Sequence, residues 1–314
     1  MKILFTSVGR RVELMQAFRA ASEKTGIALE LYGADMNPYA PALAFCDRAV
    51  MVPAIRSDEY IPALREICAA EGIDALIPTI DTDLLLLAQN RETFGGTRVM
   101  ISAPEKVALC RDKRMTADYF HSVDLLSPDP VDDIIKYRGG FPAFIKPMDG
   151  SSSIHAFKAE NPQELEDLTG QVPEYIIQPF IDGTEYTVDI LCGLNGEPIY
   201  ITPRIRLAVR AGEVLQTQID QDERIISEMF ALIADYKPRG QITVQLIRER
   251  ETGKDWYIEI NPRFGGGAPL SIKAGADSAE ALLRLLNGEK LEYMPMAAEH
   301  GAVYSRFDQS IRIK

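Results

Sequence analysis

Three oxygen-bearing side chains near the end of the chain are spaced to meet on one face of a β-hairpin. Strand alternation puts Glu259 and Asn261 on one face and sends Ile258 and Ile260 to the core. Gln245 lies between apolar neighbours on the preceding strand, and a tight hairpin register sets it directly opposite Glu259. Carboxylate and amide oxygens suit Mg²⁺, with substrate phosphates completing the shell. A solvated sheet face carries the same residue types, so both interpretations stay open.

Lysines and a small polar loop form a second group of candidates. Lys146 follows Phe144 by two residues in an apolar strand, where a lysine either reaches solvent or meets an anion. The loop 149–153 follows directly, and its glycine and serines could cradle phosphate oxygens, although any hairpin loop can have this composition. Lys113 lies in a predicted helix nearby and could equally be an ordinary surface lysine.

An arginine follows the proposed metal strand. Arg263 comes two residues after Asn261, and its guanidinium could hold a carboxylate or a transferring phosphoryl group by two parallel hydrogen bonds. The three glycines 265–267 would let the backbone bend sharply beside it. A plain turn is the alternative.

The elements that position these residues begin with an α/β unit. Short apolar runs alternate with amphipathic segments, and two of the helices are predicted to stop at Gly26 and Gly72. Such alternation indicates a parallel, doubly wound, Rossmann-like sheet. The expected strands are 2–6, 28–34, 74–78 and 99–102, and the expected helices are 10–24, 58–71 and 83–90.

Polar residues follow the strands of this unit, at the edge where ligands bind in open α/β sheets. They form either a small-molecule crevice or a set of turn and helix caps. The loop after the first strand has one glycine, which argues against a dinucleotide site, and the chain has no P-loop sequence. The polar residues are Ser7, Gly9, Asp35, Asn37, Thr79, Asp81 and Asp83.

Beyond residue 104 the pattern becomes α+β with antiparallel strands. A helix is expected over 105–120, two antiparallel strands over 141–147 and 154–159, and a strong hairpin over 241–260. The chain then divides into a Rossmann-like unit (1–105), a small subdomain (106–177) and a large subdomain with the metal and phosphate site (178–314).

Composition excludes several classes of function. The net charge is −12, from 34 basic and 46 acidic residues, without the basic excess of a nucleic-acid-binding protein. The four cysteines are scattered and predict buried thiols in a reducing compartment. We find no signal peptide and no apolar run of membrane-spanning length, so the expectation is a cytoplasmic protein with no membrane partner.

Taken in order, the motifs resemble those of the ATP-grasp superfamily, and most of all the ATP-grasp proteins similar to the large subunit of carbamoyl-phosphate synthase. Each motif is weak alone, but their order and spacing are specific, and the resemblance covers about half of the chain. It implies a Rossmann-like domain followed by an α+β ATP-grasp module of two subdomains. The motifs are Arg111-Asp-Lys113, Phe141 to Pro147, 149–153, Gln178 to Glu185, Gln245, Glu259 to Arg263 and 265–275.

The resemblance implies a role for each matching position, with ATP and Mg²⁺ (or Mn²⁺) as cofactors. Arg263 would meet the transferring phosphoryl group. Lys113 and Lys146 would contact the ATP phosphates, under a loop made by Ser151, Ser152 and Ser153. Gln178, Phe180 and Ile181 would lie against adenine, largely through backbone groups, and Glu185 would bind ribose. Gln245, Glu259 and Asn261 would hold the metal.

The function implied is ATP-dependent ligation. ATP would phosphorylate a small carboxylate to an acyl phosphate, which an amine or other nucleophile then attacks, with the small subdomain as a lid. The alternatives are one half of a split carbamoyl-phosphate-synthase-like enzyme and an ATP-binding regulatory protein without turnover. The family also suggests a homodimer. Asp81 and Asp83 could attract an ammonium group of the substrate.

Overall fold

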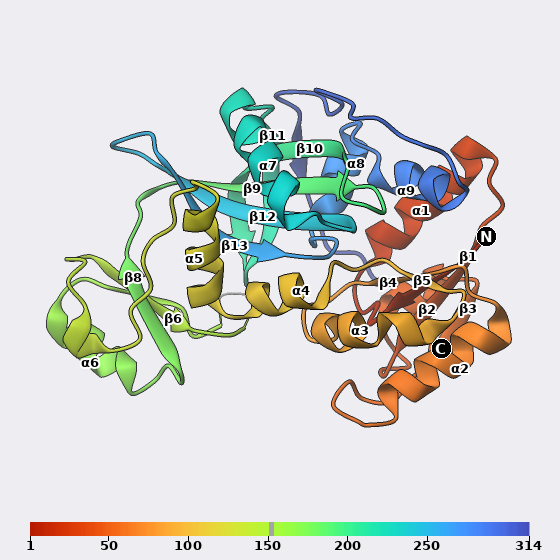
Figure 1. Ribbon diagram of the computed structural model, residues 1–314, viewed down its shortest axis with the longest axis horizontal. Helices are drawn as coiled ribbons and strands as arrows, with labels where there is room; N and C mark the ends of the chain where they lie inside the picture. Colours follow the sequence, from red (N-terminus) through yellow and green to blue (C-terminus); the bar gives the residue numbers. More distant parts are fainter. Residues whose placement is uncertain (151–153, 314) are drawn as a thin grey trace.

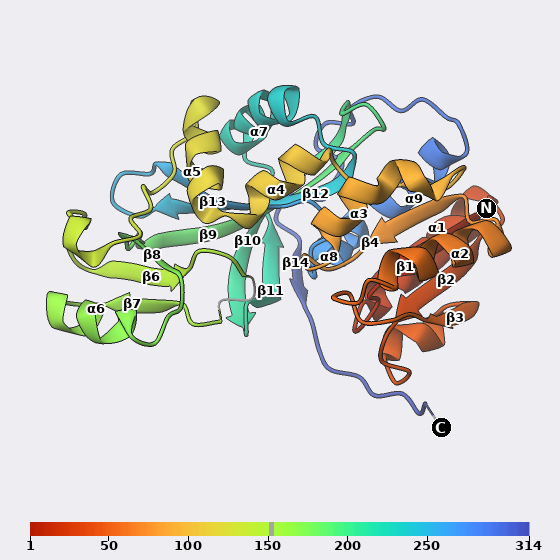
Figure 2. The ribbon, with the colours of Figure 1, turned by 60° about the horizontal axis from the view of Figure 1, so that its bottom comes forward.

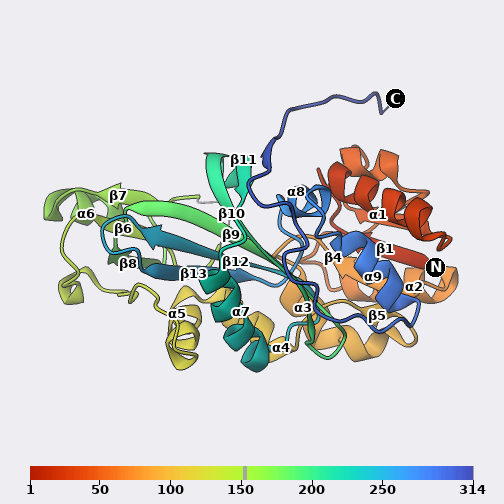
Figure 3. The same ribbon diagram turned by 90° about the horizontal axis from the view of Figure 1, so that it is seen from above.

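The computed structural model describes residues 1–150 and 154–313, and these residues form three β-sheets. Figure 1 shows the sheets spread along the longest axis of the molecule. The small sheet of β6 and β8 lies at one end, the N-terminal unit lies at the other, and the long antiparallel strands lie between them. The same order is visible from above in Figure 3. A ligand at the long sheet could therefore also contact the small sheet on one side or the N-terminal unit on the other.

The N-terminal unit is the predicted parallel sheet. Its strand order is β3-β2-β1-β4-β5, and each neighbouring pair is parallel. One strand was not expected, because β3 is mostly exposed and lacks the apolar run that marks the buried strands. The strands are β1 (Lys2–Thr6), β2 (Glu30–Asp35), β3 (Arg48–Met51), β4 (Ala75–Pro78) and β5 (Arg98–Val99).

Helices cover both faces of this sheet. As predicted, two of them end at glycines in the left-handed region, Gly26 (φ 70°) and Gly72 (φ 65°). Helices α2 and α3 share one core with the sheet, whereas α1 and the distant α9 share the other. The C-terminal part of the chain therefore completes the core of the N-terminal unit. The helices are α1 (Val12–Thr25), η1 (Pro41–Phe45), α2 (Tyr60–Glu71), α3 (Leu84–Asn90), η2 (Arg91–Phe94) and α9 (Ser278–Leu286).

Two helices, not one, connect the N-terminal unit to the rest. The structure has α4 (Pro104–Arg111) and α5 (Lys113–Ser122) where one helix over 105–120 was predicted. The break is at Asp112, whose backbone is extended and whose carboxylate accepts a hydrogen bond from the Arg114 N–H at 2.8 Å. This cap makes Lys113 the first residue of α5. Phe120 anchors α5 in the core beneath the long sheet.

The small sheet is antiparallel, with the order β7-β6-β8. Ile145 and Ile177 are fully buried on its inner face, where they pack with Leu165 of α6. This core is separate from the core of the long sheet. The elements are η3 (Ile134–Lys136), β6 (Ala143–Pro147), β7 (Phe157–Ala159), α6 (Pro162–Thr169) and β8 (Tyr175–Pro179).

The long sheet has the order β13-β12-β9-β10-β11-β14. Helix α7 covers one face, where Met229 and Leu232 are buried with Val188 and Val244. Strand β10 is continuous, with register shifts against β11 near Ala208. The elements are β9 (Gly183–Cys192), β10 (Pro198–Arg210), β11 (Glu213–Ile219), α7 (Glu223–Tyr236), β12 (Gly240–Glu249), β13 (Asp255–Asn261), α8 (Ala268–Lys273) and β14 (Val303–Ser305).

The C-terminal segment leaves β14 as an extended chain and runs past the N-terminal unit on the side of β3 (Figure 2). Within the part of the chain that the structure describes, no helix has both the length and the apolar character needed to cross a membrane.

Candidate functional site

A cavity of about 470 Å³ brings together residues from all three sheet units. Seven of the predicted site residues line it, although they are spread over about 150 positions of the chain. They come from the start of α5, from β6, from β9, and from the hairpin of β12 and β13 with the loop after it. These seven are Lys113, Lys146, Glu185, Gln245, Glu259, Asn261 and Arg263.

The predicted hairpin register is confirmed at the residues that matter. Gln245 pairs with Glu259 across β12 and β13, and both side chains line the cavity. The register shifts directly after this pair, because Leu246 faces Tyr257 and leaves Ile258 in a bulge. Ile258 was expected in the core, and this was wrong: the bulge turns it to the cavity, whereas Ile260 is buried.

One carboxylate and two amides form the candidate metal edge. The Asn261 Nδ2 donates to Glu259 Oε1 at 2.9 Å, so the two side chains already lie together. Among the described residues no group of three or more histidines, cysteines and acidic residues could hold a metal ion. The protein therefore offers a partial oxygen shell, which fits a Mg²⁺ ion that keeps phosphate oxygens and waters as its other ligands.

The protein environment lowers the pKa of both lysines in the cavity, so their charged forms are less stable than in water. Burial and, to a smaller extent, the nearby Lys113 ammonium lower the pKa of Lys146 to about 8, against the opposing effect of Glu259. Burial also lowers the pKa of Lys113, although several carboxylates, Glu259 first, act against it. Lys113 Nζ donates to the Gly150 carbonyl at 3.0 Å. A polyphosphate between these two ammonium groups would supply negative charge that stabilises both cations.

Arg263 is held at the side of the cavity nearest the N-terminal unit. Its Nη2 donates to Asp81 Oδ2 at 2.6 Å and to Asn261 Oδ1 at 3.4 Å. Its Nε is buried and has no hydrogen-bond partner among the described residues. The guanidinium therefore keeps donor capacity that a bound anion could use.

The polar ends of the parallel strands have different roles. Asp81 reaches the cavity, where it faces Arg263, so its carboxylate is already matched to a cation. Asp83 is wholly buried, accepts hydrogen bonds from Thr6 and Tyr60, and does not line the cavity, so the suggested contact with a substrate ammonium was wrong for this residue. Asp35 accepts hydrogen bonds from the Gly9 and Asn37 N–H groups and acts as a loop cap.

The three glycines after Arg263 are explained by close approach. An added Cβ would lie 2.9 Å from Thr243 Oγ1 at Gly265, 2.9 Å from Arg11 Nη1 at Gly266 and 2.7 Å from Arg204 Nη2 at Gly267. The sequence predicted that these glycines allow a sharp bend, and close packing is a second reason why no larger residue fits there. The bare backbone lets polar side chains lie directly against the loop.

Four side chains near the cavity lie outside the set of predicted site residues. Arg11 comes from the loop after β1, and Glu213 comes from the start of β11. Arg204 is 2% exposed and donates from Nε to Asp189 at 2.8 Å, whereas its Nη1 has no partner among the described residues. Arg206 donates to Glu185 at 3.0 Å. The pair Arg10-Arg11 after an apolar strand was the available signal for the first of these.

The residues expected near adenine do not line this cavity. Gln178 is buried and its Nε2 donates to the Pro128 carbonyl at 2.5 Å. The backbone N–H of Phe180 donates to the Pro142 carbonyl at 3.1 Å. Ile181 follows in the link from β8 to β9. Ser151, Ser152 and Ser153 lie outside the described residues.

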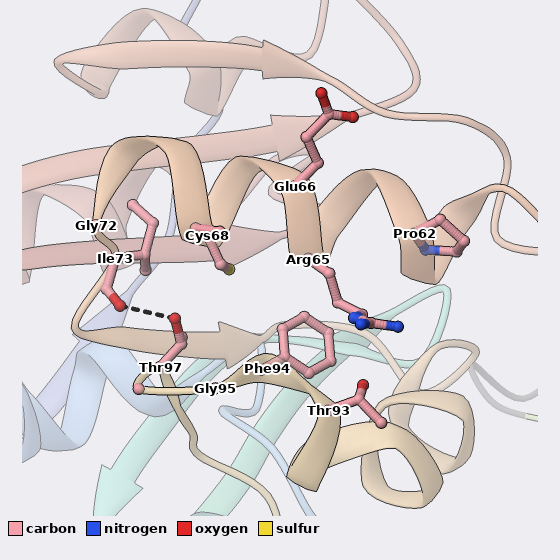
Figure 4. Close-up of a pocket in the computed structure, with 12 residues that line it drawn as sticks. Pro62, Arg65, Glu66, Cys68, Gly72, Ile73, Thr93, Phe94, Gly95 and Thr97 are labelled. Carbon is pink, nitrogen blue, oxygen red and sulfur yellow. Dashed lines mark hydrogen bonds between the residues drawn. The ribbon is translucent and has the colours of Figure 1, made fainter.

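A second depression, of about 680 Å³, lies between α2 and residues 93–97 (Figure 4). Arg65 points along it toward Thr93 and Phe94. Cys68 is buried, which raises the pKa of its thiol to about 11 and keeps the thiol neutral. This depression shares no residue with the cavity at Glu259. Its chemistry does not match the phosphate-directed set described above.

Two families match successive parts of the chain. Residues 3–101 match the PylC-like N-terminal domain, and residues 171–309 match the family described as ATP-grasp in the biosynthetic pathway with Ter operon. The first match coincides with the parallel sheet, and the second covers β9 to β14 with the candidate metal edge.

Individual relatives are ligases. The chain is 25% identical over 263 residues to a D-alanine–D-alanine ligase of Marinomonas sp.. This alignment covers 76% of this chain and 75% of the relative. It is 22% identical over 305 residues to a 3-methyl-D-ornithine–L-lysine ligase of Methanosarcina acetivorans, and this alignment covers 92% of this chain and 79% of the relative.

Solved structures share the fold. The L-amino acid ligase of Bacillus licheniformis superposes with a TM-score of 0.71 at 16% identity, over 91% of this chain and 74% of that one. A second structure is the biotin carboxylase domain dimer of Hydrogenobacter thermophilus 2-oxoglutarate carboxylase in complex with MgADP. It superposes with a TM-score of 0.74 at 15% identity, over 96% of this chain and 73% of that one.

The family matches over residues 3–101 and 171–309, the ligase relatives and the three-sheet fold together support an ADP-forming ATP-grasp carboxylate–amine ligase.

Proposed function

We propose that this ligase uses ATP to phosphorylate the carboxylate of an amino acid and couples the acyl phosphate to an amine. The relatives that act on D-alanine, on 3-methyl-D-ornithine with L-lysine, and on L-amino acids support this substrate class. One observation carries the proposal: Lys113, Lys146, Glu259 and Arg263 converge on one cavity together with oxygen ligands for a metal. No other described cavity combines these groups.

In this proposal each side of the cavity has its own task. Lys113 and Lys146 neutralise the phosphates of ATP, and the binding of phosphate offsets the cost of their burial. Gln245, Glu259 and Asn261 would hold Mg²⁺, with Mn²⁺ as an alternative ion. When bound, the metal ion would offset the negative charge on the β- and γ-phosphates. MgADP in a structural neighbour supports this part of the proposal.

Arg263 would bind the phosphoryl group during its transfer to the substrate carboxylate. The N–H groups of a guanidinium match the planar oxygen pairs of carboxylates and phosphates. Asp81 holds the guanidinium in place at 2.6 Å before a ligand binds. We assign Asp81 to positioning Arg263, because its carboxylate already faces that cation.

The nucleoside half of ATP would lie toward the small sheet. The proposal keeps Gln178, Phe180 and Ile181 near adenine through backbone groups, Glu185 near ribose, and the loop 151–153 over the phosphates. The residues 106–177 would act as a lid between the units 1–105 and 178–314, and closure would shield the acyl phosphate from water. A cytoplasmic site of action, where ATP is available, and a homodimer complete the proposal; a biotin carboxylase dimer among the neighbours supports the latter.

The test is magnesium-dependent release of ADP from ATP in the presence of D- and L-amino acid pools. We expect release that needs both a pool and Mg²⁺, and that falls at least about a hundredfold in Glu259→Ala and Lys146→Ala. The surface variant Lys290→Ala is the matched control for the loss of a lysine. Tight ATP binding with no stimulated release would favour the regulatory protein, and stimulation by bicarbonate alone would favour the half-synthetase.

A further inference from the structure

A larger cavity, of about 960 Å³, adjoins the candidate ATP site and has no role in the scheme above. Its walls come from the start of α1, the loop before η1, the β10–β11 turn, the start of α8 and the extended C-terminal segment. Figure 3 shows α1 and α8 side by side, and the C-terminal segment leaves next to β11. The cavity therefore lies between the N-terminal unit and the long sheet.

The two cavities meet at a shared wall. Arg11, Glu213, Gly265 and Gly266 line both of them. Arg11 Nη1 lies 3.4 Å from Glu213 Oε1, and an added Cβ at Gly266 would fall 2.9 Å from the same Nη1. The Arg11–Glu213 ion pair, which lies against the backbone of Gly266, thus separates the larger cavity from the side of the ATP site that holds Arg263.

The larger cavity has a cationic surplus in a chain whose net charge is −12. Its three carboxylates are Glu13, Glu213 and Asp308. Each of them already lies between two cations. The ion pairs are Glu13 with Lys273 (2.7 Å) and Arg306 (3.3 Å), Glu213 with Arg11 (3.4 Å) and Arg306 (3.3 Å), and Asp308 with Arg210 (3.0 Å) and Arg10 (3.6 Å).

Five cations therefore face three carboxylates, and an anionic ligand would balance the difference. Burial lowers the pKa of Arg11, and the neighbouring Arg263 lowers it further, so this guanidinium in particular would gain from another negative group. Helix α1 begins at the same wall, and its first residue has no side-chain cap. Its free N–H groups would add to the attraction for an anion.

Apolar side chains complete the lining. Tyr39, Phe45, Leu215 and Tyr304 line the cavity, and Phe307 of the C-terminal segment is 77% exposed at its edge. A volume of about 960 Å³ is at the upper end of the range for small-molecule sites, and is larger than a single small amino acid needs. The lining thus suits a ligand with an anionic group and an apolar part.

We infer that this cavity binds the second substrate, and that this substrate is an amine that also carries a carboxylate, with the size of an amino acid or short peptide. Arg306 and Arg210 hold its carboxylate, and its amino group passes the Arg11–Glu213 pair to reach the acyl phosphate. The nitrogen lone pair attacks the acyl carbon, the C–O bond to phosphate breaks, phosphate leaves, and the ammonium proton passes to solvent. This inference rests on the proposed ligase reaction.

The experiment compares amines with and without a carboxylate. Glycine, L- and D-alanine, L-lysine, L-glutamate, Gly-Gly and Ala-Ala would each be tested beside its C-terminal amide. The full-length wild type and the variants Arg306→Gln, Arg210→Gln and Lys290→Gln would be used, with the activated amino acid found above. Hydroxylamine serves as a small nucleophile that needs no carboxylate contact, and the hydroxamate product reports the acyl phosphate. Thermal unfolding shows which variants are folded.

We expect Arg306→Gln, and to a smaller extent Arg210→Gln, to raise KM for the carboxylate-bearing amine by about tenfold, which is the usual size of one lost charged hydrogen bond. The KM for its amide should change less than twofold, and Lys290→Gln should change neither. Equal effects on the acid and the amide would overturn the inference, as would coupling of neutral amines alone or of no amine in the panel. The absence of wild-type hydroxamate would instead refute the proposed ligase reaction, and the inference would fall with it.

Discussion

The pKa of Lys146 predicts how nucleotide binding changes with pH. Burial holds this pKa at about 8 in the free protein, and only the protonated ammonium attracts phosphate. A bound polyphosphate stabilises the cation and raises the pKa again. Nucleotide affinity should therefore be highest well below pH 8 and should weaken as the pH rises through that value.

The size of the effect follows from the titration of one group. With a pKa of about 8, Lys146 is about nine-tenths protonated at pH 7 and about one-tenth protonated at pH 9. Apparent affinity scales with the competent fraction, so Kd for ADP should rise about tenfold between these pH values, or about 1.4 kcal/mol. Lys113, whose pKa burial also lowers, would steepen the loss further.

Calorimetric titration with MgADP from pH 7 to 9.5 measures this dependence without turnover. Lys146→Met should bind more weakly at pH 7 and lose affinity less steeply with pH, and the exposed surface variant Lys290→Met should follow the wild type. A wild-type Kd that is constant over this range, or a Lys146→Met variant with the full wild-type slope, would refute the assignment of Lys146 to the phosphates.

Three further predictions test other parts of the account. Glu259→Gln keeps the shape of the side chain but removes its charge, so magnesium-dependent ADP release should fall about a hundredfold at unchanged Tm; full activity would contradict the metal edge. Gly267→Ala forces a Cβ to within 2.7 Å of Arg204 and should cost about 1–3 kcal/mol in urea unfolding, whereas Gly96→Ala, with open space around it, should change stability by less than about 1 kcal/mol. Burial raises the pKa of Asp83 to about 6, so the free energy of unfolding should fall by up to about 3 kcal/mol as the pH rises from 4 to 7, and Asp83→Asn should remove this slope; parallel profiles of the two proteins would contradict it.

The sequence predicted best what local geometry decides. The pairing of Gln245 with Glu259 depends on one short hairpin, and strand alternation with a tight turn was enough to find it. The same reasoning failed one residue away, because a bulge turns Ile258 to the cavity and no residue type announces that bulge. Phe144 and Lys146 were placed on one face by alternation, and both line the cavity.

Contacts between distant parts of the chain could not be predicted from the sequence. Arg11 and Asp81 belong to the N-terminal unit, yet they meet the loop after β13 because α9 packs that unit against the long sheet. The polar strand ends looked equivalent in the sequence, but burial separates Asp83, which is inside, from Asp81, which faces Arg263. Such sorting depends on tertiary packing, which neither periodicity nor motif spacing encodes.

Isotope transfer can show whether the substrate carboxylate becomes an acyl phosphate. The amino acid that stimulates ADP release would be labelled with ¹⁸O in its carboxylate, and the released phosphate analysed by mass spectrometry after coupling. We expect one ¹⁸O atom in inorganic phosphate for each product formed, because the bridging oxygen leaves with the phosphoryl group. Unlabelled phosphate, or label found in AMP, would contradict phosphorylation of the carboxylate by this protein.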